Sequence, residues 1–214
     1  MDREYKVVCF DMDGTLIRNT NSVEFLCQLC NKTVEVKAIE DKEHKNEISW
    51  ILADYLKAQL FNGLKLAEIK NSFNDYIQVI SNLDVVLREL RQQGFKTLLI
   101  TAGPTQVAEM LSNIYCFDRV YGSEYEVVDD CFTGKIIKHL GDNGKVEKLI
   151  EFCADNNISL EEVISVGDGE SDIKLFEQTG KSIAINYSKS VIGRANNYIE
   201  TDDLKGILGF IFNE

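Results

Sequence analysis

The sequence contains no run of about 18 apolar residues, the length at which a membrane-spanning helix becomes expected. Basic residues are also few, with 23 Lys and Arg against 35 Asp and Glu, so the net charge is −12. Such an acidic chain argues against nucleic acid or an anionic membrane as the main partner. The N-terminal residues MDREYK are charged and do not resemble a signal peptide. We therefore expect a cytoplasmic protein that binds neither membranes nor nucleic acids.

Histidine is scarce as well, and its placement disfavours a zinc site. The two histidines, His44 and His139, lie far apart in the sequence, and neither belongs to a paired ligand motif. Cys27 and Cys30 form a CxxC motif, but no second pair of ligands accompanies them. Their spacing places both on one face of a helix, which favours a packing role. Because no export signal is present, we expect the six cysteines to be reduced.

Apolar strand patterns alternate with helical patterns over much of the chain. The 214 residues are 44% hydrophobic, which suits one domain with a smaller insertion. Strict alternation of strand and helix predicts an α/β fold, a Rossmann-like parallel sheet with helices on both faces. The expected strands cover residues 6–10, 96–100, 119–122, 163–167 and 182–186, and the expected helices cover residues 83–94, 104–115, 145–156, 171–180 and 202–212.

Two segments depart from this alternation. Residues 19–82 have helical periodicity without a convincing strand, so we expect a helical insertion after the first strand. Residues 1–18 and 83–214 would then form the core. The expected helices of the insertion cover residues 22–30, 48–61 and 66–80. In the second segment, β-rich stretches flank the sequence DDCFTG, which predicts a hairpin at 125–138.

Two aspartates directly follow the first expected strand. Ligands of open parallel sheets bind beyond the carboxyl ends of the strands, and Asp11 and Asp13 occupy that place. Thr101 follows the second expected strand, Asp168 follows a later one, and Lys145 opens a helix. Close carboxylates repel each other unless a cation or a shared proton relieves them. Oxygen ligands of this kind suit Mg²⁺, which prefers a few carboxylates together with water and phosphate oxygens.

Such a site is suited to phosphoryl transfer. One aspartate can attack phosphorus and form an aspartyl-phosphate, while the other protonates the leaving oxygen and later activates water. The metal and Lys145 would stabilise the charge of the transferring group. The Thr101 hydroxyl, nearby backbone N–H groups and the helix that begins near Pro104 would hold the phosphate oxygens. We therefore expect the partner to be a small phosphorylated metabolite.

The order of these residues resembles the haloacid dehalogenase (HAD) superfamily of hydrolases. The four superfamily motifs occur in sequence: Asp11-Met12-Asp13-Gly14-Thr15, then Thr101, then Lys145, then Gly167-Asp168-Gly169 with Asp172. The segment KVEKLIEFCADNNISLEEVISVGDGESDIKLFEQTGKSIAIN is most similar to the phosphoserine phosphatase-like branch. The motifs span residues 11–172, and the strand–helix rhythm extends the likeness over the whole chain. The resemblance implies a phosphoric monoester hydrolase in which residues 19–82 form a mobile helical cap.

The resemblance also implies a role for each matching acidic residue. Asp11 resembles the nucleophile and Asp13 resembles the general acid and base. Asp11, Asp168 and the backbone carbonyl of Asp13 resemble the ligands of Mg²⁺. Asp172 resembles a supporting acidic residue near the metal.

The remaining motif residues would bind the phosphate or shape the loop around it. Thr101, Ala102 and Lys145 resemble the phosphate-binding residues of the family. Gly14 would let the backbone turn tightly beside the ligand, because glycine tolerates conformations that other residues do not. Thr15 would fix that turn by hydrogen bonding.

This chain departs from the phosphoserine phosphatase pattern where the substrate would bind. That branch carries a glutamate for the substrate ammonium, but this sequence has Thr20 at the matching position, with Glu24 nearby. No arginine lies between Arg18 and Arg88 to bind a substrate carboxylate, and Lys57 is the nearest substitute. Lysine is a point charge that cannot make the planar two-point contact of arginine. The identity of the phosphate ester therefore stays open.

Two other functions use a similar arrangement of residues. The aspartyl-phosphate could pass to a sugar hydroxyl, as in a phosphomutase, although the hairpin at 125–138 favours the hydrolase branch. The aspartates could instead form a phospho-accepting module that resembles a response-regulator receiver, although a receiver has no large insertion after its first strand. The sequence also leaves the choice between a monomer and a homodimer open.

Overall fold

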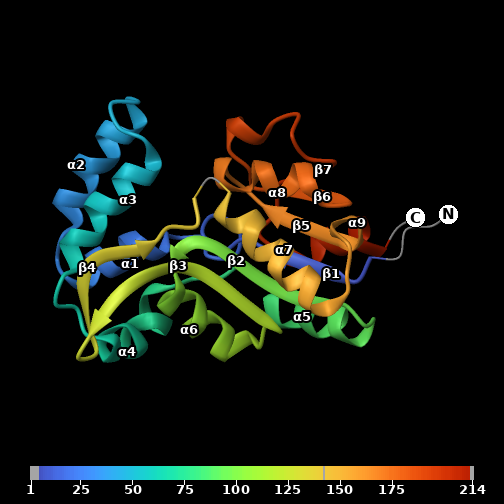
Figure 1. The fold of residues 1–214 in the computed structure, drawn as a ribbon, viewed down its shortest axis with the longest axis horizontal. Coiled ribbons are helices and arrows are strands. Elements are labelled where there is room, and N and C mark those ends of the chain that lie inside the picture. The colour runs from blue at the N-terminus through green and yellow to red at the C-terminus, as the bar shows by residue number, and fades with distance from the viewer. Residues whose placement is uncertain (1–4, 142, 213–214) are drawn as a thin grey trace.

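A computed structural model of the chain describes residues 5–141 and 143–212, which form a seven-stranded sheet in the order β4-β3-β2-β1-β5-β6-β7 (Figure 1). Neighbouring strands run parallel except β3 and β4, which are antiparallel. The predicted α/β fold is therefore confirmed. The strands are β1 (Val7–Phe10), β2 (Lys96–Pro104), β3 (Arg119–Val128), β4 (Cys131–Lys138), β5 (Val163–Gly167), β6 (Lys181–Ile185) and β7 (Asn197–Ile199).

Helices cover both faces of this sheet. They are α5 (Leu83–Gln92), α6 (Thr105–Tyr115), α7 (Gly144–Asn156), α8 (Ile173–Gln178) and α9 (Leu208–Phe212), with 3₁₀ turns at Gln59–Phe61, Leu160–Glu162, Glu170–Asp172, Lys189–Val191 and Leu204–Ile207. In β1, Val8 and Phe10 pack with buried residues of α5, α6 and α9, whereas Val7 and Cys9 pack with those of α7 and α8. Successive side chains of a strand point to opposite faces, so β1 is apolar throughout because both of its faces are covered.

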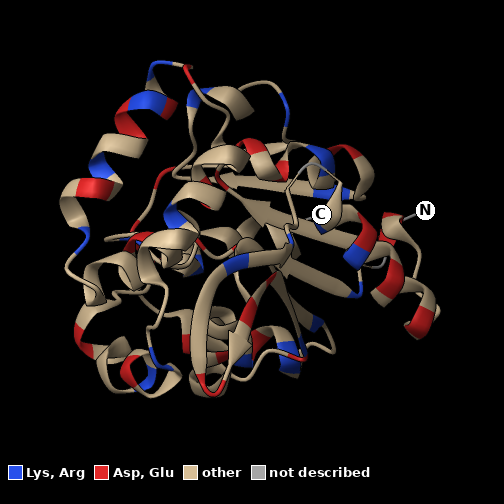
Figure 2. Ribbon diagram, turned by 60° about the vertical axis from the view of Figure 1, so that its left-hand side comes forward, with Lys and Arg blue, Asp and Glu red and all other residues tan. Residues whose placement is uncertain are grey.

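Charged side chains largely stay outside this core. Figure 2 shows the strands mostly free of Lys, Arg, Asp and Glu, which lie on the surrounding helices and loops. Among the described residues, the buried charged side chains are Asp11, Lys57, Lys145 and Asp172. Because an unpaired buried charge is costly, these four residues direct attention to a functional site. None of the helices described is both long and apolar enough to cross a membrane.

Four helices lie between β1 and α5, where the sequence predicts a helical insertion. They are α1 (Ser22–Leu29), α2 (Thr33–His44), α3 (Trp50–Ala58) and α4 (Leu66–Tyr76). Helix α2 was not predicted from the sequence. It is mostly polar and buries Val36, so its apolar stripe is too narrow to give a helical pattern. Contacts with α1 and α3 hold it instead, and Figure 1 shows α2 and α3 side by side at one end of the molecule.

Backbone pairing joins the insertion to the rest of the chain. The segments that enter and leave it lie next to each other, since Arg18 N donates to Gln78 O at 2.9 Å and Ile80 N donates to Leu16 O at 2.8 Å. A second pairing joins the segment after α3 to strand β4. These two connections place α2 and α3 beside the carboxyl ends of the strands.

The hairpin predicted at 125–138 is present, although its first strand begins earlier, at Arg119. Asp129 and Asp130 form the two-residue turn, with φ angles of +49° and +59°. Positive φ at both positions gives a turn whose twist matches that of the paired strands, and aspartate tolerates this region better than most residues. The hairpin therefore places β4 at the sheet edge, in contact with α3.

Other differences from the sequence prediction are local. Strand β2 extends beyond residue 100 to Pro104, and the predicted helix at 171–180 begins with a 3₁₀ turn before α8. The helix predicted at 202–212 likewise divides into a 3₁₀ turn and α9. Strand β7 was not predicted, because three residues are too few to establish an alternating pattern.

Gly180, between α8 and β6, offers a test of packing at the amino ends of the strands. A Cβ atom there would lie 1.9 Å from the backbone oxygen of Glu161. We expect Gly180→Ala to lower the free energy of unfolding by about 1–3 kcal/mol, because the backbone itself must shift. Gly169→Ala is the control, since its Cβ would meet nothing within 4 Å and its φ is −128°. Urea unfolding that showed equal losses for both variants would contradict this packing.

Candidate active site

The proposed site lies where the carboxyl ends of three neighbouring strands meet. Strand β1 lies between β2 and β5, so Asp11 after β1, Thr101 in β2 and Asp168 after β5 come to the same edge of the sheet. The backbone continues this order, because Asp11 N donates to Val166 O at 2.9 Å. Parallel pairing thus brings together residues that are about seventy to one hundred and sixty positions apart in the sequence.

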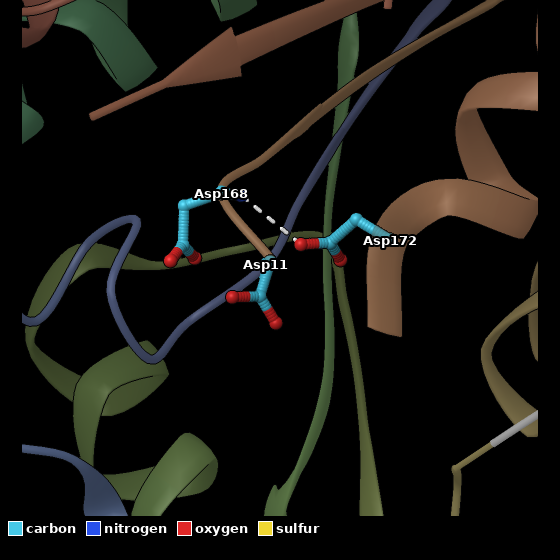
Figure 3. A group of neighbouring side chains, drawn as sticks. All are labelled: Asp11, Asp168 and Asp172. Atoms are coloured by element: carbon cyan, nitrogen blue, oxygen red, sulfur yellow. Dashed lines mark hydrogen bonds between the residues drawn. The ribbon is translucent and has the colours of Figure 1, made fainter. Parts of the chain in front are cut away.

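Asp11, Asp168 and Asp172 form a group of carboxylates at this edge. Each offers one oxygen, and the three oxygens lie within 4.8 Å of one another (Figure 3). Asp172 Oδ2 accepts hydrogen bonds from Asp168 N at 3.0 Å and from Gly169 N at 3.1 Å. Asp168 Oδ1 accepts one from Thr15 Oγ1 at 3.0 Å. Backbone and hydroxyl donors therefore fix the carboxylates in place.

Lys145, in the first turn of α7, supplies the positive charge for this group. Its Nζ lies 2.6 Å from Asp11 Oδ1, 2.7 Å from Asp172 Oδ1 and 3.0 Å from Ser171 Oγ. Burial alone would lower the pKa of the Lys145 ammonium, but attraction to Asp11 and Asp172 outweighs burial and raises it. Lys145 therefore stays protonated between two carboxylates.

The donor set fits Mg²⁺. All the groups available are oxygens, which Mg²⁺ prefers. Both oxygens of Asp172 already accept hydrogen bonds, so Asp11 and Asp168 are better placed to bind a cation. Burial, followed by repulsion from Asp172, raises the pKa of Asp168 to about 7. A divalent cation would relieve this excess of negative charge.

The Asp13 carboxylate is hydrogen-bonded to the start of α1 and does not belong to the group formed by Asp11, Asp168 and Asp172. Asp13 Oδ1 accepts a hydrogen bond from Ser22 N at 2.7 Å, and Oδ2 accepts one from Ser22 Oγ at 2.5 Å. Burial raises the pKa of Asp13 to about 6, although the hydrogen bonds from Ser22 oppose this rise. Gly103 leaves room for the pair, because a Cβ there would lie 2.2 Å from Ser22 Oγ. That the Asp13 backbone carbonyl binds a cation stays a prediction.

In the loop after β1, the backbone of Gly14 lies close to the Asp168 carboxylate, as expected of a glycine at this position. Gly14 has a φ of +82°, and a Cβ there would lie 2.2 Å from Asp168 Oδ2. Any other residue would be strained in this conformation and would displace the Asp168 carboxylate. Thr15 is buried and donates its hydroxyl to Asp168. Gly14 and Thr15 thus support the position of Asp168.

The end of β2 forms the polar part of the site that a phosphate would meet. Thr101 is buried, and its Oγ1 accepts a hydrogen bond from Gly103 N at 2.9 Å. Ser123 Oγ donates to Ala102 O at 2.6 Å, which fixes the peptide group between Ala102 and Gly103. Helix α6 begins directly afterwards, so the partial positive charge of its N-terminus lies nearby. Thr101 and Ala102 line the same cavity as Asp11 and Asp13.

This cavity has a volume of about 180 Å³, and the insertion supplies part of its wall. The insertion residues that line it are Asn21, Val23, Glu43, Trp50, Asp54 and Lys57. Of the three residues predicted for substrate binding, Lys57 lies here. Thr20 and Glu24 line a different hollow, which Glu40 shares, and Thr20 Oγ1 donates to Glu24 Oε2 at 3.0 Å. Their part in substrate binding stays a prediction.

Several residues at this cavity were missed by sequence reasoning. The missed residues Trp50 and Asp54 lie seven and three positions before Lys57, which was predicted, so all three share one face of α3. That spacing was a usable indication of a common surface. Nothing in the sequence pointed to Ser22 or Glu43, because their positions depend on how α1 and α2 pack.

A second cluster of charge lies within the insertion, behind Lys57. Glu24 and Glu40 are hydrogen-bonded neighbours. Burial, followed by the interaction with Glu24, raises the pKa of Glu40 to about 7. Burial also acts to raise the pKa of Glu24, but hydrogen bonds, first of all that from Glu40, outweigh it and lower this pKa. Of the two carboxyl groups, Glu40 is therefore the one that binds a proton more readily.

Comparisons with known proteins agree with this fold. The family model described as haloacid dehalogenase-like hydrolase matches residues 8–177. A phosphoserine phosphatase from Idiomarina loihiensis is 26% identical over 204 residues, which cover 95% of this chain and 92% of that protein. Among solved structures, a HAD family hydrolase from Salmonella enterica subsp. enterica serovar Typhi has a TM-score of 0.90 at 22% identity, over 100% of this chain and 73% of that one. A substrate-bound phosphoserine phosphatase has a TM-score of 0.85 at 22% identity, over 98% and 99% of the two chains. These two structures share the fold.

The pairing of Lys145 with two buried carboxylates predicts that loss of this lysine destabilises the metal-free protein. Lys145→Met would leave Asp11 and Asp172 buried without their counter-ion. We expect its free energy of unfolding, measured with urea in the presence of a chelator, to fall by about 3–5 kcal/mol. Lys148→Met removes a lysine of the same helix that pairs with Glu151 near the surface, and should cost at most about 1 kcal/mol. Similar losses for both variants would contradict the role of Lys145.

The raised pKa of Glu40 predicts a pH dependence of stability. The folded protein holds this proton more tightly than the unfolded chain, in which the pKa is 4.5. The resulting stabilisation is complete below about pH 4.5 and is lost as the pH rises through about 7. Glu40→Gln keeps a hydrogen-bond donor but has no proton to lose, so its stability should increase relative to wild type between about pH 5 and 8.

Urea unfolding of both proteins across this pH range measures the effect. Glu35→Gln is the control, because Glu35 lies on the same helix, forms an exposed pair with Lys32, and has a pKa below its ordinary value. Its difference from wild type should stay constant between about pH 5 and 8. An equally flat difference for Glu40→Gln would show that Glu40 is ionised throughout.

Proposed function

We propose that this chain, which belongs to the haloacid dehalogenase-like hydrolase family, hydrolyses a small phosphate monoester through an aspartyl-phosphate on Asp11. The enzyme class indicated by the relatives and structural neighbours is that of a phosphoric monoester hydrolase. The observation that carries the proposal is the cavity in which Asp11 and Asp13 lie beside Thr101, with Lys145 bonded to Asp11. Its volume of about 180 Å³ suits a small phosphorylated metabolite.

Asp11 and Asp168 would hold Mg²⁺, with the backbone carbonyl of Asp13 as a further ligand. Asp172 would support them, since its oxygens are taken by Lys145 and by two backbone N–H groups. When bound, Mg²⁺ supplies positive charge that draws the phosphate to the site and stabilises it during transfer. The dependence on Mg²⁺ is a general property of this family and is part of the proposal.

In the first step, a carboxylate oxygen of Asp11 attacks phosphorus. A bond forms between that oxygen and phosphorus as the bond from phosphorus to the ester oxygen breaks. Asp13 gives its proton to the departing oxygen, which leaves as an alcohol. Lys145, the Thr101 hydroxyl and the backbone N–H groups beyond Thr101 would bind the negative phosphoryl oxygens.

In the second step, water attacks the phosphorus of the aspartyl-phosphate. Asp13, now a carboxylate, takes a proton from that water. The bond between phosphorus and the Asp11 oxygen breaks, which releases inorganic phosphate and restores the Asp11 carboxylate. Ser22 would keep Asp13 in the orientation that both proton transfers need, because it binds both carboxylate oxygens.

We also propose that residues 19–82 act as a cap over a core formed by residues 1–18 and 83–214. The paired segments around Arg18 and Gln78 are the natural place for these two parts to move relative to each other. Because cap residues complete the cavity wall, closure would exclude water from the phosphoryl group.

Replacing the two aspartates separates their roles. With p-nitrophenyl phosphate and Mg²⁺, Asp11→Asn should reduce kcat/KM on the order of 10³-fold or more, because the nucleophile is gone. Asp13→Asn should reduce it by about 10²–10⁴-fold, because proton transfer is lost. Removal of Mg²⁺ with a chelator should have an effect similar to that of Asp11→Asn, and restored Mg²⁺ should reverse it.

The control is Asp41→Asn, which removes an exposed carboxylate from α2 outside the catalytic cavity and should change kcat/KM by less than about twofold. Wild-type activity no greater than that of Asp11→Asn would overturn the proposal. Product analysis with sugar phosphates identifies the reaction, since a hydrolase releases free phosphate and a phosphomutase yields an isomerised ester. A phospho-aspartate that lasts for many minutes would instead indicate a receiver-like module.

A further inference from the structure

The insertion supplies the part of the cavity wall that would surround the alcohol group of a bound ester. Glu43 of α2 and Trp50, Asp54 and Lys57 of α3 line the same cavity as Asp11. A phosphate bound at Asp11 must place its attached alcohol against the rest of this wall. The charge and shape of these four side chains therefore decide which esters fit.

Lys57 is the one basic side chain among the described residues that line this cavity, and it is already paired. Its Nζ lies 3.5 Å from Glu40 Oε1 and 3.4 Å from Glu43 Oε2, and its side chain is 6% exposed. Glu43 offsets its charge within the cavity, Asp54 also acts on it electrostatically from α3, and Glu40 contributes a further hydrogen-bonding oxygen behind it. Little positive field remains to attract a carboxylate on the substrate.

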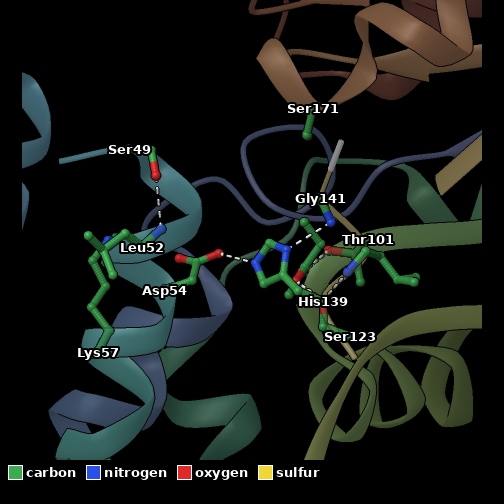
Figure 4. Close-up of polar contacts among 12 residues, drawn as sticks. Ser49, Leu52, Asp54, Lys57, Thr101, Ser123, His139, Gly141 and Ser171 are labelled. Atoms are coloured by element: carbon green, nitrogen blue, oxygen red, sulfur yellow. Dashed lines mark hydrogen bonds and ion pairs between the residues drawn. The ribbon is translucent and has the colours of Figure 1, made fainter. Parts of the chain in front are cut away.

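Asp54 contributes a negative charge to the cavity, and its hydrogen-bond partner His139 does not cancel this charge. His139 Nδ1 accepts a hydrogen bond from Gly141 N at 2.8 Å, so this nitrogen carries no proton. The proton of a neutral imidazole then lies on Nε2, which donates to Asp54 Oδ2 at 2.9 Å (Figure 4). A neutral His139 orients the Asp54 carboxylate but leaves its charge intact. Asp54 is 17% exposed, and together with Glu43 it gives this wall two negative charges against the single positive charge of Lys57.

Trp50 adds an aromatic surface to this negative wall. Its ring lies 5.3 Å from the ring of His139, centroid to centroid, at an angle of 54°. The same His139 therefore packs against Trp50 and bonds to Asp54, so the two cavity residues are held together. An indole face beside carboxylates attracts organic cations, because the negative face of the ring adds to the charge of the acids.

We infer that the enzyme prefers phosphate monoesters of amino alcohols that carry a cationic amine and no carboxylate, with the cation held by Asp54, Glu43 and Trp50. This inference rests on the proposed phosphatase function and adds the chemical class of its substrate. It differs from what the names of the relatives suggest, because phosphoserine carries a carboxylate beside its ammonium. In this cavity, that carboxylate would meet Glu43, Asp54 and a lysine that is already paired.

A matched series of esters tests the charge of the leaving group. Phosphoethanolamine and phosphocholine carry a cation, glycerol 1-phosphate is neutral at the same end, O-phosphoserine carries both charges, and 3-phosphoglycerate carries a carboxylate alone. With wild-type protein and Mg²⁺, kcat/KM for phosphoethanolamine or phosphocholine should exceed that for glycerol 1-phosphate by about tenfold or more. O-phosphoserine should fall below phosphoethanolamine by about tenfold, and 3-phosphoglycerate should be the poorest substrate.

Variants connect this preference to the cavity. Asp54→Asn and Glu43→Gln should each reduce kcat/KM for the cationic esters by about tenfold while changing that for glycerol 1-phosphate by less than about twofold. Asp41→Asn, on the same helix as Glu43 but outside the cavity, should leave the order of substrates unchanged. Lys57→Met should not reduce the ratio of O-phosphoserine to phosphoethanolamine turnover, whereas a lysine that bound the substrate carboxylate would lower it.

The outcomes separate the two proposals. If p-nitrophenyl phosphate is hydrolysed in an Asp11-dependent manner but O-phosphoserine equals or exceeds phosphoethanolamine, the substrate class is wrong and the phosphatase function stands. Equal losses for all esters in Asp54→Asn would likewise overturn the substrate class. If no ester is hydrolysed, the phosphatase function fails. The preference for cationic esters is then tested by calorimetry, in which each ester is titrated into the Asp11→Asn protein. Phosphoethanolamine should then bind at least about tenfold more tightly than O-phosphoserine, and weaker or equal binding would overturn it.

Discussion

The contact of the Lys145 ammonium with the carboxylates of Asp11 and Asp172 is the interaction on which the rest of the site depends. Three carboxylates within 4.8 Å of one another would repel strongly in a buried setting. Lys145 offsets part of this charge and leaves the remaining excess to be met by a cation. In the proposed function, this remaining negative charge would bind the metal and, through it, the phosphate. Helix α7 makes this contact by placing Lys145 in its first turn beneath the strand ends.

The insertion is connected to this charge cluster through short-range contacts. Ser22, the first residue of α1, binds both oxygens of Asp13, so the start of the insertion is bonded to the proposed proton donor. On the far side of the cavity, Asp54 of α3 meets His139, which follows β4. The insertion thus contacts the rest of the chain at both Asp13 and His139, and both parts of the chain line the cavity.

Much of the fold, and the meeting of the motif residues at the candidate site, could be predicted from the sequence, because both depend on local patterns. Strands β1, β2 and β5 are continuous apolar runs, and Asp11, Thr101 and Asp168 stand at or near their ends. Helix α2 and strand β7 gave no such pattern, since α2 buries Val36 alone among its residues and β7 has three residues. Their structure comes from neighbours that are distant in the sequence. Ser22 and Glu43 were missed for the same reason.

The sequence by itself determined the α/β architecture and the residues that meet at the carboxyl ends of the strands. Strand order follows from which apolar faces can be buried together, and the motif residues come to one edge because parallel strands all end there. Only the tertiary structure decided the character of the cavity beyond the phosphate. The charge of Lys57 is offset by Glu43 of α2, and the charge of Asp54 survives its contact with His139 because Gly141 fixes the tautomer of that histidine. Charges in a cavity act through distance and burial, and neither quantity is written in the order of residues.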